Sequence, residues 1–167
     1  MQILLIPYLN VLFGIRMRPC ELVLGDWVCM KNLGKVNKTG LDFIQVDWKL
    51  YKNLIEDIRI PLRGVTERDF EFGVVPNDLI SGIKITQKNL ELFGFKKEGE
   101  RGDYILEIGE IKVGCYHSPN GIWLASAVYK ESWFSFTTEV NYIHEIQKVI
   151  REEGFFREAT LFSLYVN

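Results

Sequence analysis

The sequence lacks the short motifs that mark common catalytic sites, and it has few residues of the types that ligate transition metals. It contains three cysteines and two histidines, and no C-x-x-C pair occurs. It also contains no G-x-S-x-G, no phosphate-binding loop and no G-x-G-x-x-G, so the usual signatures of a serine hydrolase, a nucleoside-triphosphate site and a dinucleotide site are missing. We therefore expect no catalytic residue, no metal and no cofactor.

The cysteines also bear on the compartment. Cys20, Cys29 and Cys115 form an odd set without close spacing, whereas small secreted domains usually carry an even number of cysteines as a disulfide framework. A reducing compartment fits this composition better, so we expect a cytoplasmic protein.

Runs of positive charge are missing as well. The net charge is −2 at pH 7, and no cluster of lysine or arginine forms a basic arm. Because nucleic-acid binding depends largely on neutralising phosphates, a nucleic-acid partner is not favoured. The 167 residues have 47% hydrophobic and 25% charged side chains. This composition is typical of a globular protein with one domain, or with two small units that share a core.

The residues before Arg16, MQILLIPYLNVLFGI, are apolar and carry no charge. The stretch is shorter than the roughly 20 residues of a transmembrane helix. No positive residue precedes it, and Arg16 and Arg18 stand where a signal peptide has small residues. We therefore expect no membrane segment. Residues 1–16 are interpreted either as a buried strand or as an extension upstream of a true initiator at Met17.

Residues 17–62 predict a small β-rich unit. The segments LVLGDWVCM and LDFIQV are rich in β-branched and aromatic residues, and Gly34 and Gly40 mark turns between them. The order G-D-W-V, then G-K-V, then a third apolar segment resembles the opening hairpins of an SH3-like barrel.

The next segments are less regular. IRIPL at 58–62 predicts a short strand that ends at proline, while residues 47–59 are compatible with either helix or strand. Residues 63–82 are polar and contain several glycines, which predicts an extended connection.

Residues 83–167 predict an α+β unit, and the whole chain is therefore expected to be α+β: an SH3-like β unit, then an antiparallel β-meander packed against one long C-terminal helix. Cap and turn residues set the expected boundaries. In chain order we expect a helix at 87–93 between Thr86 and Gly94, strands YILEI, IKVGCYH, IWLASAVY and WFSFT within 103–138, a helix at 139–153 between Thr138 and Gly154, and a last strand in ATLFSLYV.

The two turns of the meander predict which side chains share a face. We take Ile108 opposite Ile111 and Ser118 opposite Gly121. The face expected to pack on the long helix then carries Tyr104, Leu106, Ile108, Ile111, Val113, Cys115, Ile122, Leu124 and Val128. The other face carries Glu107 across from Lys112, Tyr116 across from Trp123, and Gly114, Ala125, Ala127 and Tyr129 nearby.

That second face predicts a partner-binding patch, because aromatic side chains above small residues are typical of binding hot spots. The candidate residues are Tyr116, Trp123, Tyr129, Gly114 and Ala125. The alternative is that residues 1–62 or the connection at 63–82 pack on this face.

His144-Glu145 begins the zinc-protease pattern H-E-x-x-H, but Lys148 stands where the second histidine belongs. An ammonium group is a poor zinc ligand at neutral pH, and His117 is the only other histidine. In the expected helix, His144, Lys148 and Arg151 fall opposite the apolar arc. We interpret them as a solvated helix face.

Cys115 and His117 are two residues apart on an expected strand, so their side chains point to the same face. A thiolate and an imidazole so placed can form a nucleophilic pair. The favoured alternative is a Cys115 thiol that packs as a small apolar residue, with His117 near solvent at the strand end.

Three segments together, ELVLGDWV, IKITQKNLELFGFKK and YIHEIQKVI, resemble a family of small uncharacterised proteins encoded by gut bacteria, their phages and mobile elements. The resemblance covers about a third of the chain. Asp26, Asn89-Leu90 and Lys148 depart from the residues usual in that family. The resemblance implies an accessory protein and supplies no catalytic residues.

The leading functional hypothesis is a non-enzymatic protein-interaction module with an unknown protein partner and an unassigned oligomeric state. One alternative is nucleic-acid binding by the SH3-like unit, which a cluster of Lys35, Lys38, Lys49 and Lys52 would favour. The other is an enzyme with an unrecognised site, which a pocket of carboxylates around His117 would favour.

The start of translation can be tested directly. If Met17 is the initiator, protein produced from the native gene will have an intact mass that begins at Met17. A mass that includes Met1 would instead favour the buried-strand interpretation of residues 1–16.

Overall fold

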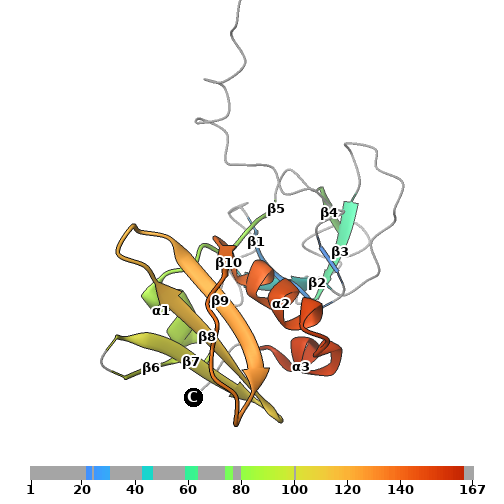
Figure 1. Cartoon of the computed structure of the whole chain (residues 1–167). Helices are drawn as coiled ribbons and strands as arrows, with labels where there is room; N and C mark the ends of the chain where they lie inside the picture. The colour runs from blue at the N-terminus through green and yellow to red at the C-terminus, as the bar shows by residue number, and fades with distance from the viewer. Residues whose placement is uncertain are drawn as a thin grey trace, which may run out of the picture. The chain divides into compact units, whose positions relative to one another are not determined.

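The computed structural model describes residues 22–23, 25–30, 43–46, 59–63, 74–76, 80–99 and 101–163. The chain divides into two compact units, residues 1–82 and residues 83–167. Helices and antiparallel sheets both occur (Figure 1), so the α+β class predicted from the sequence is confirmed.

The described part of the first unit contains an antiparallel sheet in the order β4-β3-β2-β1-β5. Its strands are β1 (Trp27–Met30), β2 (Phe43–Val46), β3 (Arg59–Arg63), β4 (Val74–Pro76) and β5 (Ile80–Ser81). The strands β1 and β2 fall within segments predicted to be strands. Strand β3 overlaps the one predicted at 58–62, but it continues past Pro61 to Arg63, so the expectation that proline ends it was wrong. Residues 63–82, interpreted from the sequence as an extended connection, contain the two short strands β4 and β5, which the sequence did not predict. Proline is tolerated in β4, since this strand ends the order and its N–H groups need no second partner.

A tight turn leads into β1. Gly25 adopts a φ of 90°, a left-handed conformation that glycine accepts without steric cost. The buried carboxylate of Asp26 accepts a hydrogen bond from the N–H of Val23 over 2.9 Å, and the N–H of Asp26 donates to the carbonyl of Val23 over 3.1 Å. These bonds close the turn and direct Val28 of β1 into the interior.

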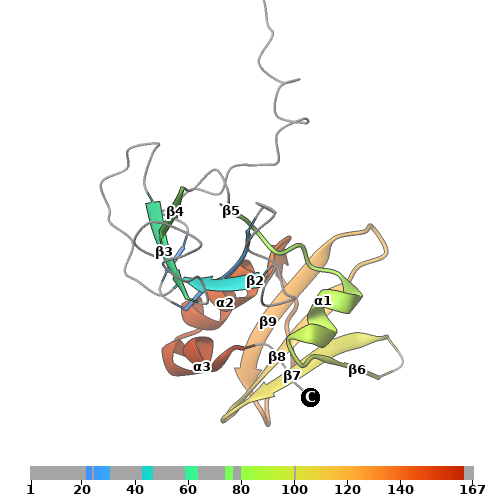
Figure 2. The ribbon, with the colours of Figure 1, turned by 180° about the vertical axis from the view of Figure 1, so that it is seen from behind.

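The second unit contains an antiparallel sheet in the order β10-β9-β8-β7-β6. Its strands are β6 (Lys96–Glu98), β7 (Asp103–Ile108), β8 (Ile111–His117), β9 (Trp123–Tyr129) and β10 (Thr138–Val140), and its helices are α1 (Gln87–Leu92), α2 (Ile143–Glu152) and α3 (Phe156–Leu161). Seen from behind, α1 lies across one face of the sheet (Figure 2). Helix α2 contacts β9 and β10, and α3 packs against α2.

Helix α1 forms as the sequence predicts. The hydroxyl of Thr86 accepts a hydrogen bond from the N–H of Asn89 over 3.1 Å, which caps the first turn. Gly94 has a φ of 83°, and the N–H of Phe95 returns to the carbonyl of Leu90 over 3.1 Å. The ring of Phe162 stacks on that of Phe93 at 5.2 Å. Leu90 and the three phenylalanines are buried, so the helix end forms part of the core.

The turn between β8 and β9 differs from the prediction by one residue. The N–H of Gly121 does donate to the carbonyl of Ser118, over 3.0 Å, but the N–H of Ser118 bonds the carbonyl of Ile122, over 2.8 Å. The loop therefore has three residues and ends in Gly121 at a φ of 81°, a common hairpin form with a glycine bulge. Ser118 pairs with Ile122 and not with Gly121. A shift of one residue moves every side chain of β9 to the opposite face.

The face of the sheet that belongs to the core is therefore only partly the predicted one. The residues of β7 and β8 that were predicted to lie on this face do lie there, because Ile108 pairs with Ile111 as expected. From β9, the structure places Ala125 and Ala127 on this face, and both are buried. Leu124 and Val128 lie on the other face and Ile122 is exposed, so their assignment to the core was wrong.

The second face is covered by the chain itself. Residues 133–137, predicted to be a strand, form no strand, and β10 begins only at Thr138. The rings of Phe134 and Phe136 from this segment lie over Gly114 of β8, where an added Cβ would come within 2.8 Å of each ring. The glycine thus leaves the space that the two rings occupy, and the segment crosses the sheet in front of β8 and β9 (Figure 1).

Helix α2 begins later than predicted. Thr138 belongs to β10 and does not cap the helix. Instead, the carboxylate of Glu145 accepts hydrogen bonds from the N–H groups of Asn141 and Tyr142, the second over 3.1 Å. The end is as predicted: Gly154 has a φ of 90°, and the N–H of Phe155 bonds the carbonyl of Ile150.

The buried side of α2 is wider than its apolar arc. Ile143, Ile146, Val149 and Ile150 are buried as predicted. His144 is only 5% exposed and Gln147 is fully buried, so placing His144 on a solvated face was wrong. The expected single long helix is not what the structure shows, because two helices, α2 and α3, lie in this region. Residues 159–161 of the predicted last strand belong to α3, and residues 164–166 of that prediction lie outside the described residues.

The fit at Gly114 gives a stability prediction. Replacement of Gly114 by Ala should lower the free energy of unfolding by about 1–3 kcal/mol, because the new methyl group must displace two aromatic rings. Thermal and urea denaturation of the full chain would measure the loss. In a protein that already carries Phe136→Leu, Gly114→Ala should lower the free energy of unfolding by less than it does in the wild type, because the smaller side chain leaves room for the methyl group. Equal stability of Gly114→Ala and wild type would mean that the rings do not rest on this glycine.

Candidate functional site

The register of β8 and β9 divides the predicted binding patch between two faces. Tyr116 and Gly114 lie on the face covered by Phe134 and Phe136. Trp123, Ala125 and Tyr129 lie on the other face, since Trp123 pairs with His117 and Ala125 pairs with Cys115. The prediction that these five residues form one surface was therefore wrong.

Trp123 belongs to an aromatic group at one end of the core face. Its ring lies 4.7 Å from that of His117 and 5.9 Å from that of Tyr104, and it is half-buried. Burial of the Tyr104 hydroxyl, with a smaller contribution from the carboxylate of Glu91, raises the pKa of that tyrosine. These contacts give Trp123 a packing role.

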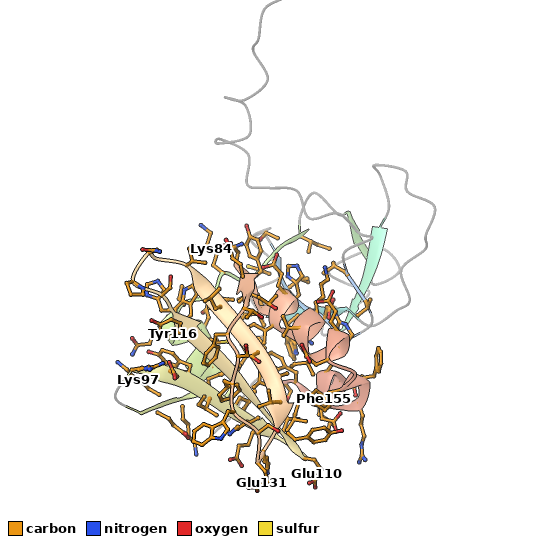
Figure 3. The ribbon with its side chains drawn as sticks, in the orientation of Figure 1. Lys84, Lys97, Glu110, Tyr116, Glu131 and Phe155 are labelled. Carbon is orange, nitrogen blue, oxygen red and sulfur yellow. The ribbon has the colours of Figure 1, made fainter. Side chains whose placement is uncertain are left out.

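Ala125 and Tyr129 also have packing neighbours on the core face. Ala125 is buried, so a partner has no access to it. Tyr129 is 62% exposed at the end of β9, and its ring meets that of Phe155 edge to face at 5.0 Å. Figure 3 labels Phe155 close to the end of the sheet where Glu110 and Glu131 are also labelled.

Tyr116 lies in a different aromatic group, which we call the aromatic cover: Tyr116, Phe134 and Phe136. The ring of Phe136 lies 5.0 Å from that of Phe134, in a stacked arrangement, and 5.8 Å from that of Tyr116. All three rings are half-buried, so each presents one side to the sheet and another to solvent. The ammonium of Lys112 lies 5.1 Å from the centre of the Phe134 ring.

Trp133 directly precedes Phe134 of the aromatic cover, and the sequence did not predict it as a candidate binding residue. Its side chain is 93% exposed, more than any other large apolar side chain among the described residues. The segment WFSFT, which begins at Trp133, was predicted to be a strand, and this prediction did not indicate an exposed tryptophan. A signal was present, however: Glu131 and Ser132 precede Trp133, and such polar neighbours are typical of a surface turn. We call Trp133 together with the aromatic cover the Trp133 surface.

Charged groups border the Trp133 surface. The ammonium of Lys130 pairs with the carboxylate of Glu107 at 3.3 Å. Glu110, Glu131 and Glu139 are exposed. Glu110 and Glu131 are labelled at one end of the sheet in Figure 3, and the carbonyl of Glu110 accepts a hydrogen bond from the N–H of Lys130 over 3.1 Å.

The Cys115 and His117 pair does not have the properties of a nucleophilic site. The two side chains do share a face, as predicted, but Cys115 is completely buried in the core. Burial raises the pKa of the Cys115 thiol far above neutral pH, so the thiol remains protonated. His117 instead contacts the ring of Trp123.

The His144 region does not match a zinc site either. The ring of His144 stacks on that of Tyr142 at 5.7 Å, and Lys148 pairs with Glu152 at 3.6 Å. In the part of the chain that the structure describes, no group of three or more His, Cys, Asp or Glu side chains is placed to hold a metal ion. Within that same part, no helix has both the length and the apolar character needed to cross a membrane.

The lysines that would favour nucleic-acid binding, Lys35, Lys38, Lys49 and Lys52, lie outside the described residues. Comparison with protein-family models gave no match, and comparisons with curated proteins and with solved structures gave none either. Functional inference therefore depends on the geometry of the chain itself.

The state of Cys115 can be tested with a thiol reagent. In a variant with Cys20 and Cys29 replaced by serine, the folded protein should leave Cys115 unmodified by maleimide over hours, because the thiol is buried and protonated. The same variant in denaturant should react fully, as intact mass would show. Rapid modification of the folded protein would contradict the buried position.

Proposed function

We propose that this chain is a non-enzymatic protein-interaction module and that the Trp133 surface is its contact region. The observation that carries the proposal is the 93% exposure of Trp133. An exposed single apolar residue is ordinary, but a nearly bare tryptophan beside three half-buried aromatic rings is not. Tryptophan and tyrosine are also the side chains most enriched among binding hot spots.

The packing of the aromatic cover against the sheet also favours binding. Phe134 and Phe136 are held against Gly114, and the ring of Phe136 contacts that of Tyr116. A partner would therefore meet rings that already have fixed positions, which reduces the conformational entropy lost on association. The large apolar side chain of Trp133 is in contact with water, and its transfer from water to a partner's surface would contribute favourably to the free energy of binding.

For the first unit we propose an SH3-like fold. The strand order β4-β3-β2-β1-β5 supports it, since the last strand returns to pair with the first. A cytoplasmic location is proposed with it, and the odd number of cysteines and the buried thiol of Cys115 are compatible with a reducing compartment. Nucleic-acid binding is the less favoured function, because carboxylates outnumber basic side chains around Trp133, the most exposed large apolar residue among those described.

A comparison of variants tests the contact region. Tagged full-length protein and Trp133→Ala would be used to capture partners from a lysate of the source organism, with and without nuclease. We expect a nuclease-resistant protein partner whose recovery, or affinity once purified, falls about tenfold or more with Trp133→Ala, since truncation of a central aromatic residue costs about 1.4 kcal/mol or more.

Phe156→Ala is the matched control, because Phe156 is an aromatic residue on α3 with 66% exposure and lies outside the Trp133 surface. Both variants should keep the wild-type melting temperature to within a few degrees, as surface substitutions usually do. Equal recovery of the partner by wild type and Trp133→Ala would contradict the proposed contact region. Recovery that depends on nucleic acid would contradict a protein partner.

A further inference from the structure

The Trp133 surface and its border carry more negative than positive charge. The carboxylates are those of Glu98, Asp103, Glu107, Glu110, Glu131 and Glu139, and the ammonium groups are those of Lys96, Lys112 and Lys130. Six negative and three positive groups leave an excess of three negative charges. Two of the positive groups are also engaged: Lys130 pairs with Glu107, and Lys112 lies over the ring of Phe134.

The strand register places one of the remaining carboxylates on the same face of the sheet as the aromatic cover. Tyr116 pairs with Leu124 of β9, and Leu124 pairs with Glu139 of β10, so these three side chains form one row on the same face. Glu139 is exposed at the β10 end of that row. Glu131 lies two residues before Trp133 in the chain and is exposed as well. One exposed carboxylate thus shares the face of the aromatic cover, and another lies close to Trp133 in the chain.

The aromatic rings complement this charge. The face of an aromatic ring is electrostatically negative and attracts ammonium and guanidinium groups, and the indole of tryptophan does so most strongly. The chain already shows such a contact, since the ammonium of Lys112 lies 5.1 Å from the centre of the Phe134 ring. The indole of Trp133, at 93% exposure, leaves a larger ring face open to solvent.

From this arrangement we propose that the occupant of the Trp133 surface is a basic peptide segment of the partner, with an arginine or lysine side chain on the Trp133 indole and others near Glu131 and Glu139. The inference rests on the proposed function and names its partner class. Arginine suits the site best, because its planar guanidinium stacks on an indole and is more weakly hydrated than an ammonium. Phosphate groups of nucleic acids and anionic lipids would instead be repelled by the carboxylates.

Labelled nonapeptides of alternating glycine and arginine, glycine and lysine, and glycine and citrulline are suitable probes. Citrulline keeps the shape of arginine and removes its charge. In fluorescence-anisotropy titrations with the full chain, we expect the arginine peptide to bind at least as tightly as the lysine peptide. We expect the citrulline peptide to bind about tenfold or more weakly, because it loses both the ring contact and the ion pairs.

Substitutions in the full chain test whether the arginine peptide binds at the Trp133 surface. Trp133→Ala should weaken the arginine peptide about two- to fivefold, as should Glu131→Gln combined with Glu139→Gln. Glu91→Gln is the matched control, because Glu91 is exposed on α1 and its carboxylate acts on Tyr104, which lies on the core face and not on the face of the aromatic cover. It should leave the affinity unchanged. Raising the salt concentration should weaken the arginine peptide, since exposed charges are screened.

Equal binding of the arginine and citrulline peptides would overturn the inference, as would unchanged affinity in the doubly neutralised variant. These outcomes are distinct from a failure of the proposed function. If Trp133→Ala loses its captured partner but the charged peptides bind no better than the neutral one, the contact region stands and the basic partner is wrong. If Trp133→Ala keeps the captured partner, the proposed contact region itself is wrong.

Discussion

The second unit depends on the pairing of β8 with β9, and that pairing depends on one loop. Gly121 adopts a left-handed conformation that closes a three-residue loop, and Ser118 then pairs with Ile122. Because side chains alternate along a strand, this loop decides the face of every residue in β9. It places Ala125 and Ala127 in the core and leaves room there for the larger side chains of the neighbouring elements.

The same pairing prepares the opposite face for the aromatic cover. Gly114 pairs with Ser126, so neither strand presents a large side chain at that point. Phe134 and Phe136 occupy the space, and the segment that carries them continues directly into β10. Phe134 and Phe136 pack against the sheet, and Trp133, which directly precedes them, remains exposed to solvent. Exposure of this tryptophan follows from the packing of the residues around it and not from a lack of structure.

Elements with complete local signals were predicted well. Thr86 and Gly94 bound α1, Gly154 ends α2, and the two-residue turn at Gly109-Glu110 joins β7 to β8. In each case the deciding hydrogen bonds join residues a few positions apart, so the residue types are sufficient to predict them. The start of α2 was missed because Thr138 offered an equally good local cap, and pairing of β10 with β9 outweighed it.

The sequence by itself determined the α+β class, the caps of α1 and the apolar arc of α2, because short-range backbone geometry and hydrophobic periodicity are properties of consecutive residues. Only the tertiary structure decided the face of Trp123, the burial of His144 and the exposure of Trp133. The face of Trp123 depends on a one-residue difference in a loop, which the local pattern does not reveal. The burial of His144 and the exposure of Trp133 depend on packing against residues far apart in the chain.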